Sequence, residues 1–149
     1  MNKRESCRAI VFVDSKLVTM KRVKDGRLYY TFPGGGLETG EQQKDCVVRE
    51  CIEEFGIVVE PVKRIYIYEN DKTKQYFYLC NYVSGVVGSG VGEEFQEDRN
   101  KGEYEPTLMD IKDIPSLPLM PPEIAAAVAE DAVDLYKNYN KPERLFVVE

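Results

Sequence analysis

The sequence predicts an α/β fold of the α+β kind, in which a mixed β-sheet is flanked by helices. The chain has 149 residues, 43% of them hydrophobic, which is the size of one domain with its own core. Short β-branched and aromatic runs lie on both sides of a helical pattern at residues 40–55, and a second helical pattern lies near the C-terminus. Elements in this order favour a sheet covered by helices, and we expect a single domain over residues 1–149.

Two strands that form a hairpin are expected first. Residues 7–13 and 16–22 are apolar runs separated by Asp14 and Ser15. A turn at residues 24–26 precedes a third strand over residues 28–32, which runs into the glycine segment at 33–36. We expect this segment to be a loop that leads into the helix.

The helix is expected over residues 40–55, because its start and its end carry recognisable signals. Thr39 is the predicted N-cap, with Gln42 three positions later to complete a capping box. Gly56 is predicted to end the helix in the left-handed conformation. Glu41 lies in the predicted first turn, where the helix dipole favours a negative charge.

The remaining elements are strands, one long loop and a second helix. β-Branched and aromatic residues predict strands over residues 57–59, 63–68, 76–83 and 104–111. The glycine-rich and then acidic stretch at 84–103 is expected to be a mobile loop. Residues 121–138 predict a helix with prolines at its start and Lys137 in its last turn.

Composition excludes several classes of function. The chain has no histidine, so Ser-His-Asp triads and zinc sites built on histidine are ruled out. Its 20 basic and 26 acidic residues give a net charge of −6, which disfavours long nucleic acids as partners. A small phosphate ligand remains compatible with this charge, because bound divalent ions can invert it locally.

The cysteines and the apolar runs indicate the cellular compartment of the protein. No C-x-x-C spacing is present, so the cysteines are expected to be reduced and mostly buried. They are Cys7, Cys46, Cys51 and Cys80. No signal peptide and no apolar run of membrane-spanning length is visible, so we expect a cytoplasmic protein with no membrane partner.

One motif indicates the chemistry. Residues 35–57 read GGLETGEQQKDCVVRECIEEFGI and fit the pattern G-x5-E-x7-R-E-U-x-E-E-x-G-U, where U is bulky and aliphatic. The fixed letters fall on Gly35, Glu41, Arg49, Glu50, Glu53, Glu54 and Gly56. This segment resembles the Nudix box, with the one departure that Cys51 stands at an aliphatic position. The resemblance implies a Nudix-type α/β/α sandwich and a hydrolase.

The glutamates support this interpretation on physical grounds. On a helix, Glu50, Glu53 and Glu54 are spaced i, i+3 and i+4 and project from one side, which we expect to point away from the core. Two carboxylates about 5 Å apart repel each other by roughly 3 kcal/mol at an effective dielectric of 20, so a cation is expected between them. Hard oxygen ligands favour Mg²⁺, with Mn²⁺ as the alternative.

Each of these residues also has a structural interpretation. An isolated E-x-x-E-E on a helix is more often a solvated acidic face, and only the surrounding motif reverses that preference. An isolated Arg49 would be an ordinary surface residue, whereas within the motif it resembles the residue that orients the glutamates. Glu41 either supports the site or only favours the helix N-terminus.

The resemblance implies metal-dependent hydrolysis of a nucleoside diphosphate linked to another moiety X, such as a nucleoside triphosphate or a nucleotide sugar. Glu50 and Glu54 are the expected metal ligands, and Glu53 is a ligand or the base that activates water. The carbonyl of Gly34 is the candidate backbone ligand by resemblance. In such proteins the base can instead come from a later loop, where this chain offers Glu93, Glu94 and Glu97.

Substrate recognition is expected beside the glycine segment. The bare backbone of Gly35 and Gly36 allows close approach of a phosphate. Tyr30 and Phe32 are candidate aromatic contacts for the base, although most aromatic residues here are expected in the core. No motif identifies X, and a homodimer is a further expectation because dimers are frequent in the family.

Two other functions compete with hydrolysis. A sensor that binds a nucleotide or metabolite with little turnover usually lacks some of the glutamates or carries a DNA-binding appendage, and this sequence shows neither feature. Isomerases of isoprenoid diphosphates with a similar motif use cysteine and histidine, and this chain lacks histidine. The sequence therefore favours the hydrolase.

Overall fold

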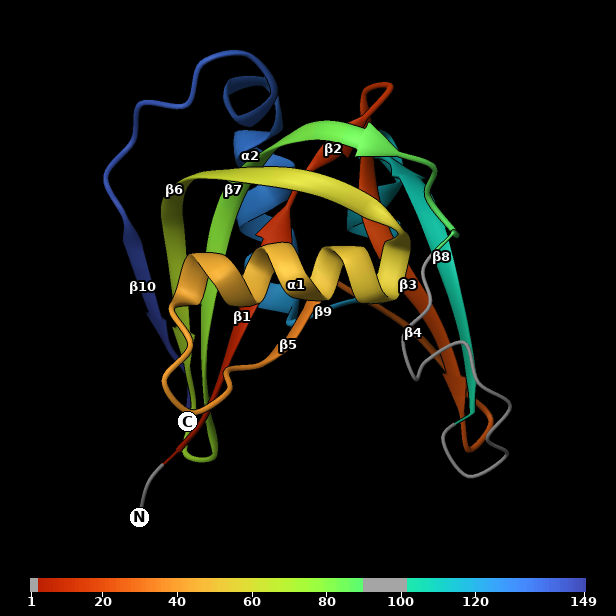
Figure 1. Ribbon diagram of the computed structural model, residues 1–149. Coiled ribbons are helices and arrows are strands. Elements are labelled where there is room, and N and C mark those ends of the chain that lie inside the picture. The colour runs from red at the N-terminus through yellow and green to blue at the C-terminus, as the bar shows by residue number, and fades with distance from the viewer. Residues whose placement is uncertain (1–2, 90–101) are drawn as a thin grey trace.

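The computed structural model describes residues 3–89 and 102–149, and two layers of strands lie between two helices (Figure 1). Among the described residues, the strands form two five-stranded sheets. Sheet 1 has the order β10 (Arg144–Val147), β6 (Ile57–Glu69), β7 (Thr73–Gly85), β1 (Arg4–Ile10) and β5 (Gly34–Gly36). It is mixed, because β1 pairs with β7 and β10 pairs with β6 in parallel, while the other pairs are antiparallel.

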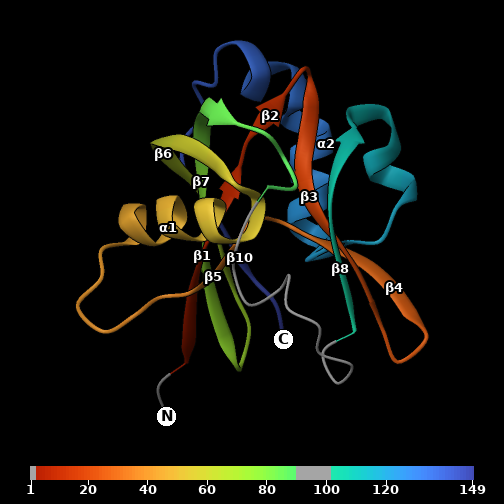
Figure 2. The same ribbon diagram turned by 45° about the vertical axis from the view of Figure 1, so that its right-hand side comes forward.

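Sheet 2 is built around β3, and Figure 2 shows it beside sheet 1. Its strands are β2 (Phe12–Val13), β3 (Lys16–Lys24), β4 (Arg27–Thr31), β8 (Glu103–Asp110) and β9 (Leu119–Met120). The prediction of a mixed α+β fold with helices on its faces is thus confirmed. The strands differ from the expectation in dividing between two sheets, because β1 pairs with β5 and β7 while β3 pairs with β4 and β8.

Both predicted hairpin turns are present, and the backbone conformation of their central residues explains them. Asp14 and Ser15 have φ values of 51° and 66°, and the next turn has 53° at Asp25 and 72° at Gly26. Positive φ at both central residues matches the twist of the flanking strands, and Asp and Gly tolerate it well. These turns set the registers Val13↔Lys16 and Lys24↔Arg27.

The helix α1 (Gln43–Phe55) begins three residues later than predicted. Its N-cap is Gln42, without a side-chain capping bond, so the predicted cap at Thr39 is wrong. The carboxylate of Glu41, which would have belonged to that first turn, instead accepts a hydrogen bond from the backbone N–H of Glu38. The predicted end is confirmed: Gly56 adopts the left-handed conformation, with φ 72°, and its N–H reaches the carbonyls of the last turn.

Later elements agree with the prediction in kind and differ in extent. The two strands expected at 57–59 and 63–68 are one continuous strand, β6, whose pairing with β7 shifts register at three places. The residues expected to open a mobile loop, Ser84 and Gly85, still belong to β7. The helix α2 (Pro122–Lys137) and β8 match their predicted ranges closely. The short 3₁₀ helix η2 (Ile111–Ser116), β9 and β10 were not predicted.

The core has two parts, one under each helix. Alternate residues of β1 point to opposite sides, so Cys7 and Ala9 lie in the part under α1 and Ile10 lies in the part under α2. Phe55 closes the α1 side with no exposed surface, and burial of such a side chain contributes about 1.5–3 kcal/mol. The four cysteines are buried and free, as predicted. The glutamates of the motif are therefore carried by a helix that the core holds firmly.

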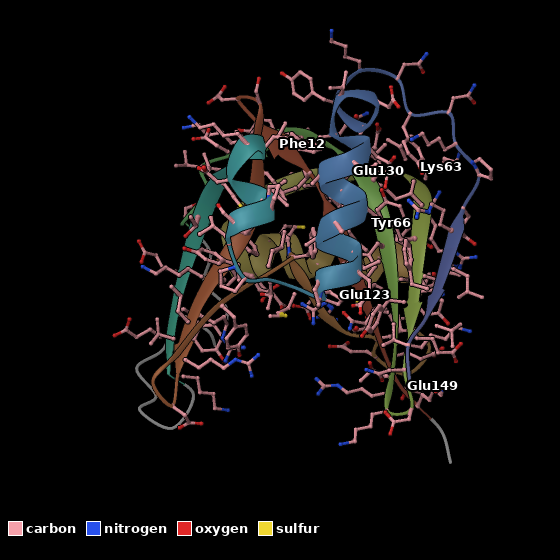
Figure 3. The ribbon with its side chains drawn as sticks, turned by 180° about the vertical axis from the view of Figure 1, so that it is seen from behind. Phe12, Lys63, Tyr66, Glu123, Glu130 and Glu149 are labelled. Carbon is pink, nitrogen blue, oxygen red and sulfur yellow. The ribbon has the colours of Figure 1, made fainter. Side chains whose placement is uncertain are left out.

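A buried carboxylate attaches α2 to sheet 1 through Tyr66 of β6, which is labelled beside α2 in the view from behind in Figure 3. Asp131 is 1% exposed and accepts hydrogen bonds from the Tyr66 hydroxyl at 2.7 Å and from Lys141 Nζ at 2.5 Å. Arg144 Nη1 lies 3.8 Å from Oδ2 of Asp131, the oxygen that accepts the bond from Tyr66. Burial of this charge is offset by these partners, so Asp131 links α2, β6 and the C-terminal segment. None of the described helices is long and apolar enough to cross a membrane.

Candidate catalytic and metal site

The glycine segment is an edge strand of sheet 1 and not a loop. In β5, Gly34 pairs with Arg8 and Gly35 pairs with Cys7 across to β1. Gly34 has φ 145°, and a Cβ there would lie 2.1 Å from the carbonyl oxygen of Cys7. A Cβ on Gly35 would lie 2.6 Å from Oε1 of Glu50. One glycine therefore allows the strand to pair with β1, and the other allows a carboxylate of α1 to reach the backbone.

The carboxylates of Glu50 and Glu54 lie against this strand. Each residue is only 8% exposed, and Oε1 of Glu54 accepts a hydrogen bond of 2.8 Å from the backbone N–H of Gly34. The expectation that the acids point away from the core is wrong for these two. They share the inner side of α1 with Cys51 and Phe55, whereas Ile52 is 44% exposed. The bare backbone of β5 creates the space for two buried carboxylates.

Arg49 connects the acidic residues. Its guanidinium donates two hydrogen bonds to Glu41, from Nε at 2.8 Å and from Nη2 at 3.1 Å. Nη1 donates to Glu50 Oε1 at 3.1 Å and to Glu53 Oε2 at 3.2 Å. Nη2 also reaches the carbonyl of Gly36 at 3.3 Å. The contact with Glu41 raises the pKa of Arg49, so its charge is retained and the predicted orienting contacts are present.

The comparisons with known proteins agree with this geometry. A family model described as the NUDIX domain matches residues 3–132. The chain belongs to the Nudix family. A Nudix hydrolase of Bacillus subtilis strain 168 named YvcI, itself uncharacterized, is 26% identical over 118 residues, which cover 75% of this chain and 69% of that protein. The chain is accordingly a Nudix hydrolase.

Solved structures show the same Nudix fold. A Nudix hydrolase from Nitrosomonas europaea superposes with a TM-score of 0.75 at 16% identity, over 99% of this chain and 80% of that one. An ADP-ribose pyrophosphatase from Streptococcus suis 89-1591 superposes with a TM-score of 0.69 at 20% identity, over 97% of this chain and 99% of that one. At these identities the likeness establishes the fold alone.

The donor atoms of this Nudix site fit a hard divalent cation. Glu50 and Glu54 supply carboxylate oxygens beside a backbone that carries no side chain, and Mg²⁺ is held in proteins by one or two carboxylates together with water and substrate phosphates. In residues 3–89 and 102–149, no three acidic or cysteine side chains are grouped closely enough to hold an ion by themselves. The remaining ligands would have to be backbone, water or substrate oxygens.

Two predicted ligands have other contacts in this structure. The carbonyl of Gly34 accepts a hydrogen bond of 3.1 Å from Arg8, a residue that the sequence did not single out. The carboxylate of Glu53 is bound by Arg49 but is 45% exposed, so it remains open to solvent beside the two buried acids. The loop glutamates considered as alternative bases, at positions 93, 94 and 97, lie outside the described residues.

Two predicted substrate contacts belong to the core. Phe32 is 1% exposed and packs edge-on against Phe77 with ring centroids 5.3 Å apart, and Tyr30 is 9% exposed in the same cluster. Their assignment to a substrate-binding surface is therefore wrong. Because side chains alternate along an extended chain, Tyr30 and Phe32 point to the same side, and this is the side buried in the core cluster that includes residues of α2.

Gly35→Ala is expected to lower activity by roughly 10–100-fold while leaving the fold intact. The added methyl group would lie 2.6 Å from Glu50 Oε1, so the carboxylate has to move, and misplaced groups commonly cost about two orders of magnitude in rate. Turnover and urea unfolding of the variant would be measured beside Thr39→Ala, a substitution at an exposed position between β5 and α1. Equal activity in both variants would show that the approach of Glu50 to β5 is unimportant.

Glu41 makes part of the stability depend on pH. The hydrogen bond from Arg49 lowers the pKa of Glu41 from 4.5 to about 2, so its stabilising effect is complete above pH 4.5 and is lost as pH falls towards 2. We expect Glu41→Gln to reduce the free energy of unfolding by about 2 kcal/mol at pH 7, after allowance for solvent screening. The difference from wild type should shrink below pH 4.5 in urea titrations. Glu38→Gln, at a side chain 67% exposed, should change little at any pH.

Proposed function

We propose that this Nudix hydrolase splits the diphosphate bond of a nucleoside diphosphate linked to a moiety X, using Mg²⁺. The observation that supports this most strongly is the pair of buried carboxylates, Glu50 and Glu54, packed against the bare strand β5. Carboxylate oxygens beside a backbone without side chains suit Mg²⁺, which takes one or two protein carboxylates and completes its coordination with water and substrate phosphates. When bound, Mg²⁺ would neutralise the diphosphate and lower the pKa of the attacking water.

The residues of the site have separate roles in the proposed reaction. Glu50 and Glu54 would hold the ion, and the N–H of Gly34 keeps the carboxylate of Glu54 in place. Arg49 fixes Glu50 and Glu53 relative to each other through one Nη1 atom. Glu53, which is open to solvent, takes the proton from the attacking water. The water oxygen forms a bond to phosphorus, and the bond from that phosphorus to the bridging oxygen breaks. The products are two phosphate monoesters, or one nucleoside monophosphate and pyrophosphate when X is itself a phosphoryl group.

The substrate is a small nucleotide derivative, and its identity is to be found by a panel. Nucleoside triphosphates, nucleotide sugars and ADP-ribose are incubated with Mg²⁺, with Mn²⁺ or with EDTA, and products are separated by ion-exchange chromatography. ADP-ribose is included because of the structural likeness to an ADP-ribose pyrophosphatase. We expect saturable turnover of one substrate class that EDTA abolishes. Saturable binding of panel members without turnover would instead support the sensor function.

A further inference from the structure

A pocket next to the glycine strand has no role in the function proposed above. It has a volume of about 280 Å³ and lies where the ends of sheet 1 meet β9 and the start of α2. Arg8, Tyr68 and Gln75 give it polar groups, and Met120 and Pro121 give it an apolar wall. Pockets for small ligands combine these two kinds of surface. This volume is just below the usual range of roughly 300–1,000 Å³ for ligand pockets, so the pocket suits one group of a ligand and not a whole one.

Arg8 joins this pocket to the candidate metal site. It is paired with Gly34 across β1 and β5, and its Nη1 atom donates hydrogen bonds of 3.1 Å to the carbonyls of Gly34 and of Phe32. These bonds fix one side of the guanidinium. Within residues 3–89 and 102–149, its Nε and Nη2 atoms make no hydrogen bond to the protein. Because Arg8 lines the pocket, these donors are available to a ligand there.

The surroundings of Arg8 suit an anion that lies between the candidate metal site and the pocket. Burial lowers the pKa of Arg8, with the charges of Glu54 and Glu50 acting in the opposite direction, and the guanidinium stays charged because arginine is not deprotonated in proteins. A guanidinium offers two parallel donors to a phosphate group. The side chain of Gln75 forms no hydrogen bond within the described part of the chain and adds a neutral polar group to the same wall.

We propose that Arg8 is a substrate-binding residue that contacts the phosphate not attacked by water, and that the group carried by this phosphate enters the pocket of Arg8, Tyr68 and Gln75. This inference rests on the proposed function and deepens it, because it requires substrates with at least two linked phosphates. One phosphate lies at Glu50 and Glu54, and the next lies at Arg8. A nucleoside monophosphate would occupy only one of these positions and would bind more weakly.

The test measures binding separately from catalysis, with inorganic pyrophosphate as the probe. Isothermal titration calorimetry with Mg²⁺ is performed on wild type, Arg8→Gln and Arg27→Gln, where Arg27 is an exposed arginine at the β3–β4 turn. We expect Arg8→Gln to weaken binding roughly 10–100-fold, as for loss of a charge-assisted hydrogen-bonding group, and Arg27→Gln to bind within twofold of wild type. With the natural substrate, Arg8→Gln should raise KM more than it lowers kcat.

A second variant protects the test against misfolding of the first. Gln75→Glu places a carboxylate in the same wall of the pocket at a partly buried position of β7, and it should weaken pyrophosphate binding by a similar factor. Circular dichroism establishes that each variant is folded. Binding by folded Arg8→Gln or by Gln75→Glu as tight as by wild type would overturn the proposal, as would absence of binding by wild type. A protein that binds pyrophosphate through Arg8 but turns over no substrate would refute the hydrolase function and leave this site standing.

Discussion

Glu54→Gln is expected to lower metal-dependent turnover by roughly 10³-fold. Metal stabilisation of the transition state contributes several kcal/mol, and each 1.36 kcal/mol corresponds to a factor of ten in rate. Glutamine has the same shape as glutamate and can still accept the 2.8 Å hydrogen bond from the N–H of Gly34. The variant therefore removes one negative charge from the buried pair with Glu50 while leaving the local contacts in place.

The controls separate loss of metal from loss of fold. Asp45→Asn removes a carboxylate at an exposed position in the first turn of the same helix and should keep wild-type activity. Titration of Mn²⁺ by calorimetry should show weaker binding to Glu54→Gln, and its unfolding midpoint in urea should be equal to or higher than that of wild type, because repulsion with Glu50 is relieved. Full activity in folded Glu54→Gln would remove this residue from the site.

Much of the site was predictable because its residues are close in sequence. The spacing of Glu50, Glu53 and Glu54 on a helix fixes their relative positions, and glycines just before that helix allow a carboxylate to approach the backbone. The end of α1 at Gly56 was predictable for the same reason, because the left-handed conformation is a local property of that residue. Local periodicity and backbone preference suffice for such features.

Features that depend on distant segments were not predictable. The partner of the glycine segment is β1, 26 residues away from it between Arg8 and Gly34, and no local pattern indicates that pairing. The inward direction of Glu50 and Glu54 follows from the pairing of β5 with β1, because this pairing places β5 against α1 and so determines which side of the helix is buried. Arg8 lies within an apolar run of the sequence. A charged residue in the middle of a predicted strand indicates that its side chain has a polar partner, but the sequence does not identify that partner.

Arg49→Lys is expected to reduce both stability and activity, although the charge is retained. One ammonium group cannot replace a guanidinium that contacts Glu41, Glu50 and the carbonyl of Gly36 from three nitrogen atoms. The side chain is 25% exposed, so we expect a loss of roughly 2–4 kcal/mol in the free energy of unfolding, somewhat less than for a fully buried pair. Turnover should fall as well, because Glu50 and Glu53 lose their common donor.

Arg64→Lys is the matched comparison, because Arg64 also bonds a glutamate and a residue of α1. It donates to Glu143 at 2.6 Å and to Gln43 at 3.1 Å, with 35% of its side chain exposed. A pair this open to solvent contributes about 1 kcal/mol or less, so urea titrations should give a clearly smaller loss for Arg64→Lys and unchanged turnover. Similar small losses in both variants would mean that Arg49 acts by charge alone. A large loss of activity confined to Arg49→Lys would instead show that the hydrogen-bond geometry of Arg49 positions Glu50 and Glu53 for the proposed reaction.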